Sequence, residues 1–234
     1  MEKNEIRYEA PLTQFLLDKA SGIKMPISGT FEVSPICNFA CRMCYVRKTR
    51  QEVAAHPRPM MELEDWLKIA REAREAGLLY LLLTGGEPFL WPRFWELYEA
   101  LAKMGFLISL NTNGSLIDEA AVKRLREHPP VRVNITLYGA SDAAYESLCQ
   151  VKGVFSRVDQ AIEKLRQAGI LVKLNCSVTP QNAEDLEAMN RYAQERGLIL
   201  EANTYMFPPL RRAQDRAGHL RRRRPWRRTH SERY

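Results

Sequence analysis

The stretch "LLYLLLTGGEP" occupies residues 78–88. It begins with a short, uninterrupted apolar run, which is typical of a strand buried on both faces of a parallel sheet. Gly85 and Gly86 end the run, and glycine permits tight turns and close backbone approach. The stretch therefore predicts a central strand of a helix-covered sheet that ends in a glycine-containing polar turn.

Strand-like and helix-like segments alternate on both sides of this run. The expected strands are 29–36, 78–86, 106–114, 131–139, 170–180 and 198–207, and the expected helices are 60–77, 91–105, 116–128, 141–149, 154–169 and 183–197. Strands that are separated by helices pair in parallel, with right-handed crossovers. Six units are too few to close the eight-fold barrel. The prediction is an α/β fold, a curved and open partial (β/α)6 TIM-like barrel with parallel strands.

Polar segments stand at the carboxyl ends of the predicted strands. They include "TGGEP" (84–88), "NTNG" (111–114), "TLYG" (136–139) and "SVTP" (177–180). In parallel α/β folds, functional groups gather at this edge of the sheet. We therefore expect a polar rim that carries the chemistry, above an apolar barrel.

Three cysteines follow the first predicted strand, in "ICNFACRMCYV" (36–46). Cys37, Cys41 and Cys44 are separated by three and then two residues. A structural zinc site uses four ligands, and no fourth ligand is evident nearby. Thiolates at short spacing also bind iron–sulfur clusters. The spacing leaves both kinds of site open but favours a cluster, because three thiolates would hold three irons of a cubane and leave the fourth for a substrate or cofactor.

The cysteine loop and the glycine turn, at the ends of consecutive strands, together resemble the radical S-adenosylmethionine (radical SAM) superfamily over residues 28–209. The resemblance implies that Cys37, Cys41 and Cys44 ligate a [4Fe–4S] cluster whose fourth iron binds S-adenosyl-L-methionine (SAM). It also implies contacts with SAM for Met43, Gly85, Gly86, Glu87, Pro88, Asn111, Asn113, Thr136 and Phe207. In relatives, the glycine turn meets the methionyl ammonium group. Backbone carbonyls or a carboxylate at this turn would accept hydrogen bonds from that cation.

The SAM carboxylate lacks an obvious partner in this sequence. Some relatives carry an arginine shortly after the fourth strand, whereas Cys149 stands nearest to that position here. Arg157 is close in sequence, and the partner stays open. For Cys149 itself we favour an inert, small apolar residue near the site.

The resemblance implies reductive cleavage of SAM, which yields a 5′-deoxyadenosyl radical that abstracts hydrogen from a substrate. The core is similar to SPASM-type enzymes, so a peptide or protein substrate is expected, with a one-electron reductant such as a flavodoxin or ferredoxin. No cysteine follows Cys176, where such relatives bind auxiliary clusters. The alternatives are a radical SAM enzyme for a small molecule and a truncated, non-catalytic iron–sulfur protein.

Composition divides the chain into three parts: an N-terminal extension (1–27), a core (28–210) and an Arg-rich tail (211–234). The tail holds 10 Arg against two acidic residues, whereas residues 1–210 carry 25 basic and 26 acidic side chains. We expect the tail to be disordered and to stem from a truncation or a frame change. Because the body is neutral, nucleic acid is an unlikely partner. In the extension, residues 12–20 predict a short amphipathic helix that plugs the barrel end.

The sequence carries no secretory signal at its N-terminus and no apolar run of the roughly 18 residues that a membrane span needs. A cytoplasmic protein without a membrane partner is the resulting expectation. Its thiols are then expected to be reduced rather than paired in disulfides.

Overall fold

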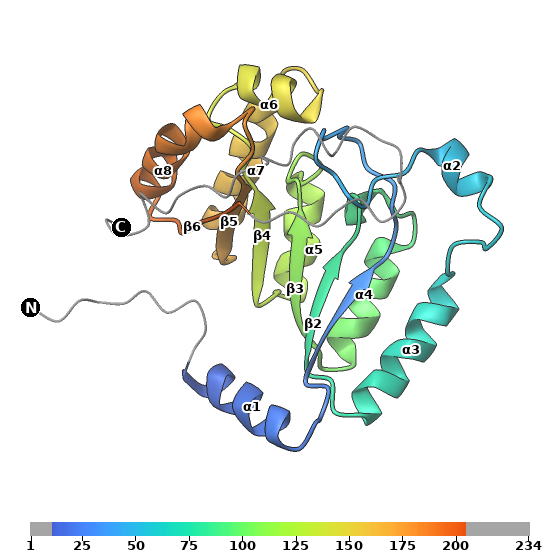
Figure 1. The fold of residues 1–234 in the computed structure, drawn as a ribbon. Coiled ribbons are helices and arrows are strands. Elements are labelled where there is room, and N and C mark those ends of the chain that lie inside the picture. Colours follow the sequence, from blue (N-terminus) through green and yellow to red (C-terminus); the bar gives the residue numbers. More distant parts are fainter. Residues whose placement is uncertain (1–10, 205–234) are drawn as a thin grey trace, which may run out of the picture.

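A computed structural model of the chain describes residues 11–204 (Figure 1). Its centre is a six-stranded sheet in which all neighbours are parallel and the spatial order follows the chain order. The strands are β1 (Ser28–Glu32), β2 (Tyr80–Thr84), β3 (Leu107–Thr112), β4 (Arg132–Thr136), β5 (Val172–Ser177) and β6 (Leu200–Asn203). The sheet is curved, and β1 and β6 form its two edges. The predicted open, partial (β/α)6 barrel is confirmed.

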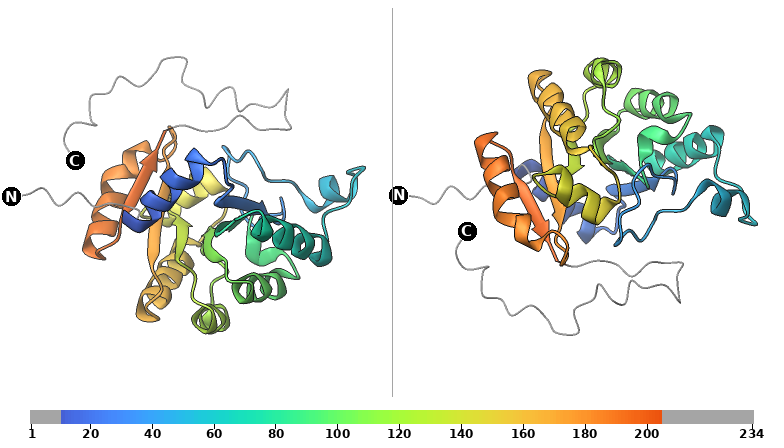
Figure 2. Two further views of the ribbon diagram at one scale, coloured as in Figure 1. Left: turned by 90° about the horizontal axis from the view of Figure 1, so that it is seen from below. Right: turned by 90° about the horizontal axis from the view of Figure 1, so that it is seen from above.

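Helices cover the outer face of this sheet, as the view along the strands shows (Figure 2). They are α3 (Leu63–Glu75), α4 (Phe94–Lys103), α5 (Glu119–Glu127), α7 (Phe155–Gln167) and α8 (Leu186–Glu195), with 3-10 turns η1 (Pro88–Leu90) and η2 (Ala183–Asp185). Two further helices, α2 (Arg50–Ala54) and α6 (Asp142–Cys149), lie toward the carboxyl ends of the strands instead (Figure 1). Asp118 is the N-cap of α5, because its Oδ1 accepts a hydrogen bond from the amide of Ala121 at 2.8 Å. Among residues 11–204, no helix has both the length and the apolar character that crossing a bilayer requires.

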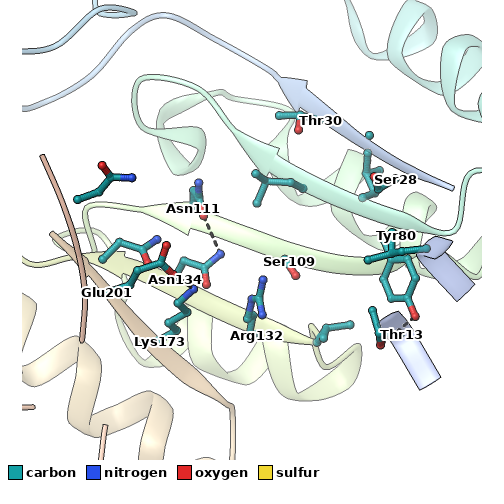
Figure 3. A pocket seen from close by; sticks show the side chains of 17 residues that line it. Thr13, Ser28, Thr30, Tyr80, Ser109, Asn111, Arg132, Asn134, Lys173 and Glu201 are labelled. Atoms are coloured by element: carbon teal, nitrogen blue, oxygen red, sulfur yellow. Dashed lines mark hydrogen bonds and ion pairs between the residues drawn. The ribbon is translucent and has the colours of Figure 1, made fainter. Parts of the chain in front are cut away.

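The hydrophobic core lies between the sheet and the helices. On β2, β3 and β4, the buried side chains Leu83, Leu110 and Ile135 belong to the alternate set that meets the helices. The intervening positions, such as Asn111 and Asn175, point into the barrel. The expectation of an apolar barrel beneath a polar rim is therefore wrong. Helices seal only the outer face, and most side chains that line the interior of this open barrel are polar or charged, with a few apolar ones such as Leu82 and Val131 (Figure 3).

The end of β1 and the presence of α2 differ from the sequence expectation for local reasons. β1 ends at Glu32 rather than at residue 36, because Pro35 has no amide hydrogen and the Ser34 hydroxyl accepts a hydrogen bond from the Ile36 amide. The helix α2 was not expected. A sequence signal for it exists in the capping box that Thr49 and Glu52 form at its start.

A further helix, α1 (Pro11–Gly22), lies at the amino-terminal ends of the strands (Figure 1). The hydroxyl of Tyr80, at the start of β2, donates a hydrogen bond to Thr13 Oγ1 at 3.2 Å. Thr13 and Leu17 both line the cavity inside the barrel. The predicted helix at residues 12–20 is thus present, and it lies beneath the barrel interior.

Candidate cluster and SAM site

A cavity of about 350 Å³ opens at the carboxyl ends of the strands. Its lining comes from the cysteine loop and from the ends of β2, β3, β4 and β5. The residues are Cys37, Phe39, Cys41, Met43, Cys44, Tyr45, Val46, Thr84, Gly85, Gly86, Asn111, Thr112, Asn113, Thr136, Tyr138, Asn175 and Ser177. Its volume falls in the range of about 300–1,000 Å³ that small-molecule sites occupy.

All three loop cysteines line this one cavity. The amide of Phe39 donates to Cys37 Sγ at 3.4 Å, and the amide of Arg47 donates to Cys44 Sγ at 3.3 Å. The loop is also anchored to the end of α6, because the amides of Ala40 and Arg42 donate to main-chain carbonyls there, each at 3.0 Å. Backbone hydrogen bonds thus fix both the loop and its thiols.

The protonation of the three thiols follows from their surroundings. Burial raises the pKa of Cys37 to about 12, and burial also raises the pKa of Cys44. The pKa of Cys41 is lowered instead, because the Cys149 thiol and the Tyr138 hydroxyl hydrogen-bond to its sulfur. A bound metal requires thiolates, so metal binding would release protons from Cys37 and Cys44.

The donor set fits an iron–sulfur cluster. Within the described part of the chain, no three side chains of His, Cys, Asp or Glu are arranged to hold a single metal ion. Three thiols distributed around one cavity suit a cluster, in which each thiolate binds a different iron. The cavity also leaves room beside the thiols for a small organic ligand.

Backbone hydrogen bonds join the glycine turn after β2 to the start of the cysteine loop. The amide of Gly86 donates to Ser34 O at 2.7 Å, and the amide of Glu87 donates to Ile36 O at 2.9 Å. A Cβ on Gly85 would lie 2.4 Å from Ser34 O, and one on Gly86 would lie 2.5 Å from Ile36 O. Gly85 also has a φ of +150°, which favours glycine. The close backbone approach that was expected here is thus made to the loop that carries the cysteines.

Glu87 is fully buried and does not line the cavity. Its carboxylate accepts hydrogen bonds from the Thr112 hydroxyl and the Asn113 amide at 2.9 Å, and from the Phe89 amide at 3.3 Å. Burial nevertheless raises its pKa to about 7. Pro88 is also buried and begins η1. Of the two kinds of acceptor expected at this turn, the carboxylate does not reach the cavity, whereas Gly85 and Gly86 line it.

The other expected SAM contacts are distributed as follows. Met43, Asn111, Asn113 and Thr136 line the cavity, whereas Phe207 lies outside the described residues. Asn113 is held in place, because its Nδ2 donates to Asn38 Oδ1 at 2.9 Å and lies 3.8 Å from Cys37 Sγ. The polar side chains from β3 and β4 therefore surround the same space as the thiols.

The lining also includes residues to which sequence reasoning assigned no SAM contact, among them Tyr138, Asn175 and Ser177. A signal for the last two exists in "LNCS" (174–177), where polar residues alternate with Leu174 and Cys176. That alternation places Asn175 and Ser177 on the inner face of β5, and the apolar pair on the outer face.

Some relatives carry an arginine shortly after the fourth strand, and the two residues near that position here, Cys149 and Arg157, lie in different surroundings. Cys149 is fully buried at the end of α6, and hydrogen bonding from its thiol lowers the pKa of Cys41. Arg157 lies exposed on α7 and does not line the cavity. No Lys, Arg or His is among the lining residues that the structure describes here, so hydroxyl and amide groups face this space.

Comparison with known proteins agrees with this arrangement. Residues 31–193 match the family described as "Radical SAM superfamily". The chain belongs to the radical SAM superfamily. The cofactors of this family are a [4Fe–4S] cluster and SAM, which suit the thiols and the adjoining space in the cavity.

Curated relatives share about a quarter of their aligned residues with the chain. The antilisterial bacteriocin subtilosin biosynthesis protein AlbA of Bacillus subtilis is 26% identical over 174 residues, which cover 74% of this chain and 38% of AlbA. An AdoMet-dependent heme synthase of Methanosarcina barkeri is 25% identical over 178 residues, covering 76% of this chain and 50% of the synthase. The chain thus spans half or less of the length of these two relatives.

Among solved structures, SuiB of Streptococcus suis has the same fold. Its structure with the precursor peptide SuiA superimposes with a TM-score of 0.65 and 18% identity, and covers 86% of this chain and 47% of SuiB. SuiB has also been crystallised with S-adenosylmethionine, and that structure gives a TM-score of 0.63. At this level of identity, the likeness shows the barrel fold.

Proposed function

We propose that this protein is a radical SAM enzyme that acts on a peptide or protein. When bound, the [4Fe–4S] cluster and SAM supply a 5′-deoxyadenosyl radical that abstracts hydrogen from the substrate. The electron comes from an external one-electron donor, such as a flavodoxin or ferredoxin.

One observation carries the catalytic assignment. Cys37, Cys41 and Cys44 line the same cavity as Gly85 and Gly86, although the two segments are far apart in the sequence. The backbone hydrogen bonds between residues 34–36 and 86–87 hold these segments together. The three thiols and the glycine turn are therefore held side by side at one cavity.

The residues of the chain have separate tasks in this proposal. The three cysteines hold the cluster, and the carbonyls of Gly85 and Gly86 accept hydrogen bonds from the methionyl ammonium group. Asn175 and Ser177 are our candidates for the SAM carboxylate, because they bring hydrogen-bond donors to a cavity lining without cationic side chains in the described residues. Phe39 and Tyr138 form an aromatic wall that excludes water, with ring centroids 6.5 Å apart.

The substrate class rests on the relatives. AlbA is named for bacteriocin biosynthesis, and SuiB has been solved with a precursor peptide. The second candidate is a small-molecule substrate, which the similarity to a heme synthase favours. The two substrate classes can be separated by incubating the enzyme with SAM, reductant and deuterium-labelled candidates of each class. The true substrate transfers its deuterium into 5′-deoxyadenosine.

Anaerobic reconstitution with iron and sulfide, followed by SAM and dithionite, tests the reaction itself. We expect a brown protein that forms 5′-deoxyadenosine, and loss of both iron and product in Cys37→Ala, Cys41→Ala and Cys44→Ala. Cys176→Ala is the matched control, because that buried thiol contacts Met189 on the outer side of β5. A colourless, zinc-loaded protein, or product formation that survives the three substitutions, would contradict the proposal.

A further inference from the structure

A closed ring of side-chain hydrogen bonds joins the turn after β3 to the start of the cysteine loop. Asn38 Nδ2 donates to Ser115 Oγ at 2.8 Å, and the Ser115 hydroxyl donates to Asn113 Oδ1 at 2.7 Å. Asn113 Nδ2 completes the ring by donating to Asn38 Oδ1 at 2.9 Å. Asn38 directly follows Cys37 in the sequence, so the ring is built against the first cysteine of the site.

The orientation of the Asn113 amide within this ring is fixed. Its Oδ1 accepts a second hydrogen bond, from the Ser115 main-chain amide at 2.9 Å. A main-chain amide can only donate, so the oxygen of Asn113 has to face Ser115 and the nitrogen has to face the cysteine loop. With the amide turned the other way, two donors would face each other at Ser115.

The same nitrogen reaches the sulfur of Cys37. Asn113 Nδ2 lies 3.8 Å from Cys37 Sγ, and the Phe39 amide donates to that sulfur at 3.4 Å. Asn113 is only 6% exposed, and its main-chain amide donates to the Glu87 carboxylate at 2.9 Å. Both the main chain and the side chain of Asn113 are therefore held in place while a donor points at Cys37.

Hydrogen bonds within the described residues occupy the whole Asn113 side chain. An amide side chain offers two N–H donors and one oxygen with two lone pairs. Asn38 and Cys37 take the two donors, and the hydroxyl and amide of Ser115 take the oxygen. This occupancy favours a role toward Cys37 over the contact with SAM that the family resemblance implies for Asn113, although the side chain lines the cavity.

Hydrogen bonds to the sulfurs of an iron–sulfur cluster influence its reduction potential. Reduction adds one negative charge, which the irons share with their sulfur ligands. A donor that points at a ligand sulfur stabilises this added charge, so the cluster becomes easier to reduce. The donor to Cys37 comes from the Asn113 side chain and can be removed by substitution, whereas the sulfur of Cys44 accepts from a main-chain amide.

We propose that Asn113 is a positioning residue that raises the reduction potential of the cluster through its hydrogen bond to Cys37. Asn38 and Ser115 hold its amide in the orientation that this bond requires. The side chain exchanges neither a proton nor an electron, since the one electron comes from the external donor. This inference rests on the proposed function, because it takes Cys37 as a ligand of the [4Fe–4S] cluster.

The reduction potential of the anaerobically reconstituted full chain tests this inference, measured without SAM in a redox titration followed by electron paramagnetic resonance. We expect Asn113→Ala to shift the potential to a more negative value. Ser115→Ala should cause a smaller shift in the same direction, because the Ser115 main-chain amide still holds the Asn113 oxygen. Asn190→Ala is the matched control and should keep the wild-type potential, since Asn190 lies partly exposed on α8 and outside the cavity lining.

Asn113→Asp provides a second test that preserves the size of the side chain. It keeps an oxygen for the Ser115 amide but replaces the donor with a negative charge, so its shift should exceed that of Asn113→Ala. SAM binding to reconstituted Asn113→Ala, measured by equilibrium dialysis, should stay within about threefold of the wild type.

Three results overturn the inference. The first is a wild-type potential in Asn113→Ala, including the case in which only Asn113→Asp shifts the potential. The second is an unchanged potential together with much weaker SAM binding, which would assign Asn113 to SAM. The third is a lower iron content and a lower unfolding temperature with the wild-type potential in the cluster that remains, which would show a merely structural role.

The two proposals fail in different measurements. A protein that forms 5′-deoxyadenosine, but whose potential is the same with and without the Asn113 amide, keeps the proposed reaction and loses this inference. A protein whose potential falls in Asn113→Ala but that never cleaves SAM does the reverse.

Discussion

The hydroxyl of Thr112 lies 2.9 Å from both carboxylate oxygens of Glu87, at a place where both residues are buried. This contact joins the end of β3 to the glycine turn after β2. The amide of Asn113 adds a second bond to the same carboxylate. Because Asn113 also approaches Cys37 Sγ, the carboxylate lies directly behind one wall of the cluster site.

Glu87 should make the stability of the cofactor-free chain depend on pH. Its folded-state pKa of about 7 exceeds the usual 4.5, so the native state retains a proton that the unfolded chain releases between these values. The stabilisation is complete below about pH 4.5 and is lost as the pH rises through about 7. Its size is on the order of 3 kcal/mol. Urea denaturation from pH 4.5 to 8 measures it.

Glu87→Gln should remove most of this pH dependence, because glutamine has no proton to release in this range. Glu127→Gln is the matched control, since Glu127 is exposed on α5. The stability of this control variant should decline with rising pH as it does in the wild-type protein. If the stability of Glu87→Gln fell with rising pH as steeply as that of the wild type, Glu87 would not be the group responsible for the pH dependence.

Thr112→Val should destabilise the protein by about 1–3 kcal/mol, because it leaves the buried carboxylate with one donor fewer. It should also move the decline in stability to higher pH, since the lost hydrogen bond favoured the charged form of Glu87. Thr112→Ser keeps the hydroxyl and should retain the wild-type midpoint of the pH dependence. Equal midpoints in the valine and serine variants would argue against the hydrogen bond.

The sequence predicted the fold well because the pattern that defines it is local. Each strand and helix has its own apolar periodicity, and the alternation of strands with helices along the chain is enough to predict parallel pairing. The cysteine loop and the glycine turn were recognisable because their residue types and spacing are specific. The cavity inside the barrel was missed because polar residues such as Asn134 and Lys173 are scattered over separate strands, and only the strand register brings them together.

The role of Glu87 was also beyond sequence reasoning. A carboxylate beside two glycines suggests a ligand contact, but the direction of the side chain depends on the packing of η1 against β3. Here the side chain also caps η1, since it accepts a hydrogen bond from the Phe89 amide. The same motif thus serves the site through its backbone and the core through its carboxylate.

Gly86→Ala should destabilise the protein by about 1–3 kcal/mol and reduce the iron bound on reconstitution. The added Cβ would lie 2.5 Å from Ile36 O and 2.8 Å from Pro35 O, both backbone atoms that cannot rotate away. The cysteine loop must therefore shift. Chemical denaturation and iron analysis measure the two effects.

Gly22→Ala is the matched control for this substitution. It introduces the same group at the end of α1, where no atom of residues 11–204 outside the neighbouring chain lies within 4 Å of the added Cβ. Its stability should stay within about 0.5 kcal/mol of the wild type, with full iron content. Gly86→Ala with normal stability and normal iron would show that the loop tolerates displacement.

Asn182→Ala should destabilise the protein by about 3 kcal/mol, because this side chain joins the ends of β4 and β5. Its Oδ1 accepts from the Thr179 amide at 2.7 Å, and its Nδ2 donates to Tyr138 O at 3.1 Å and to Ser177 O at 3.2 Å. The residue is only 1% exposed, so water cannot replace these bonds easily.

Tyr138 and Ser177 both line the cavity at the carboxyl ends of the strands, where SAM is proposed to bind. Asn182→Ala should therefore also weaken SAM binding to the reconstituted protein. Urea denaturation and equilibrium dialysis with SAM measure the two effects, and Gln194→Ala, an exposed substitution on α8, should leave both unchanged. An Asn182→Ala protein as stable as the control would show that the carbonyls of Tyr138 and Ser177 find other donors. Preserved stability together with weaker SAM binding would instead place the effect of Asn182 in the cavity wall alone.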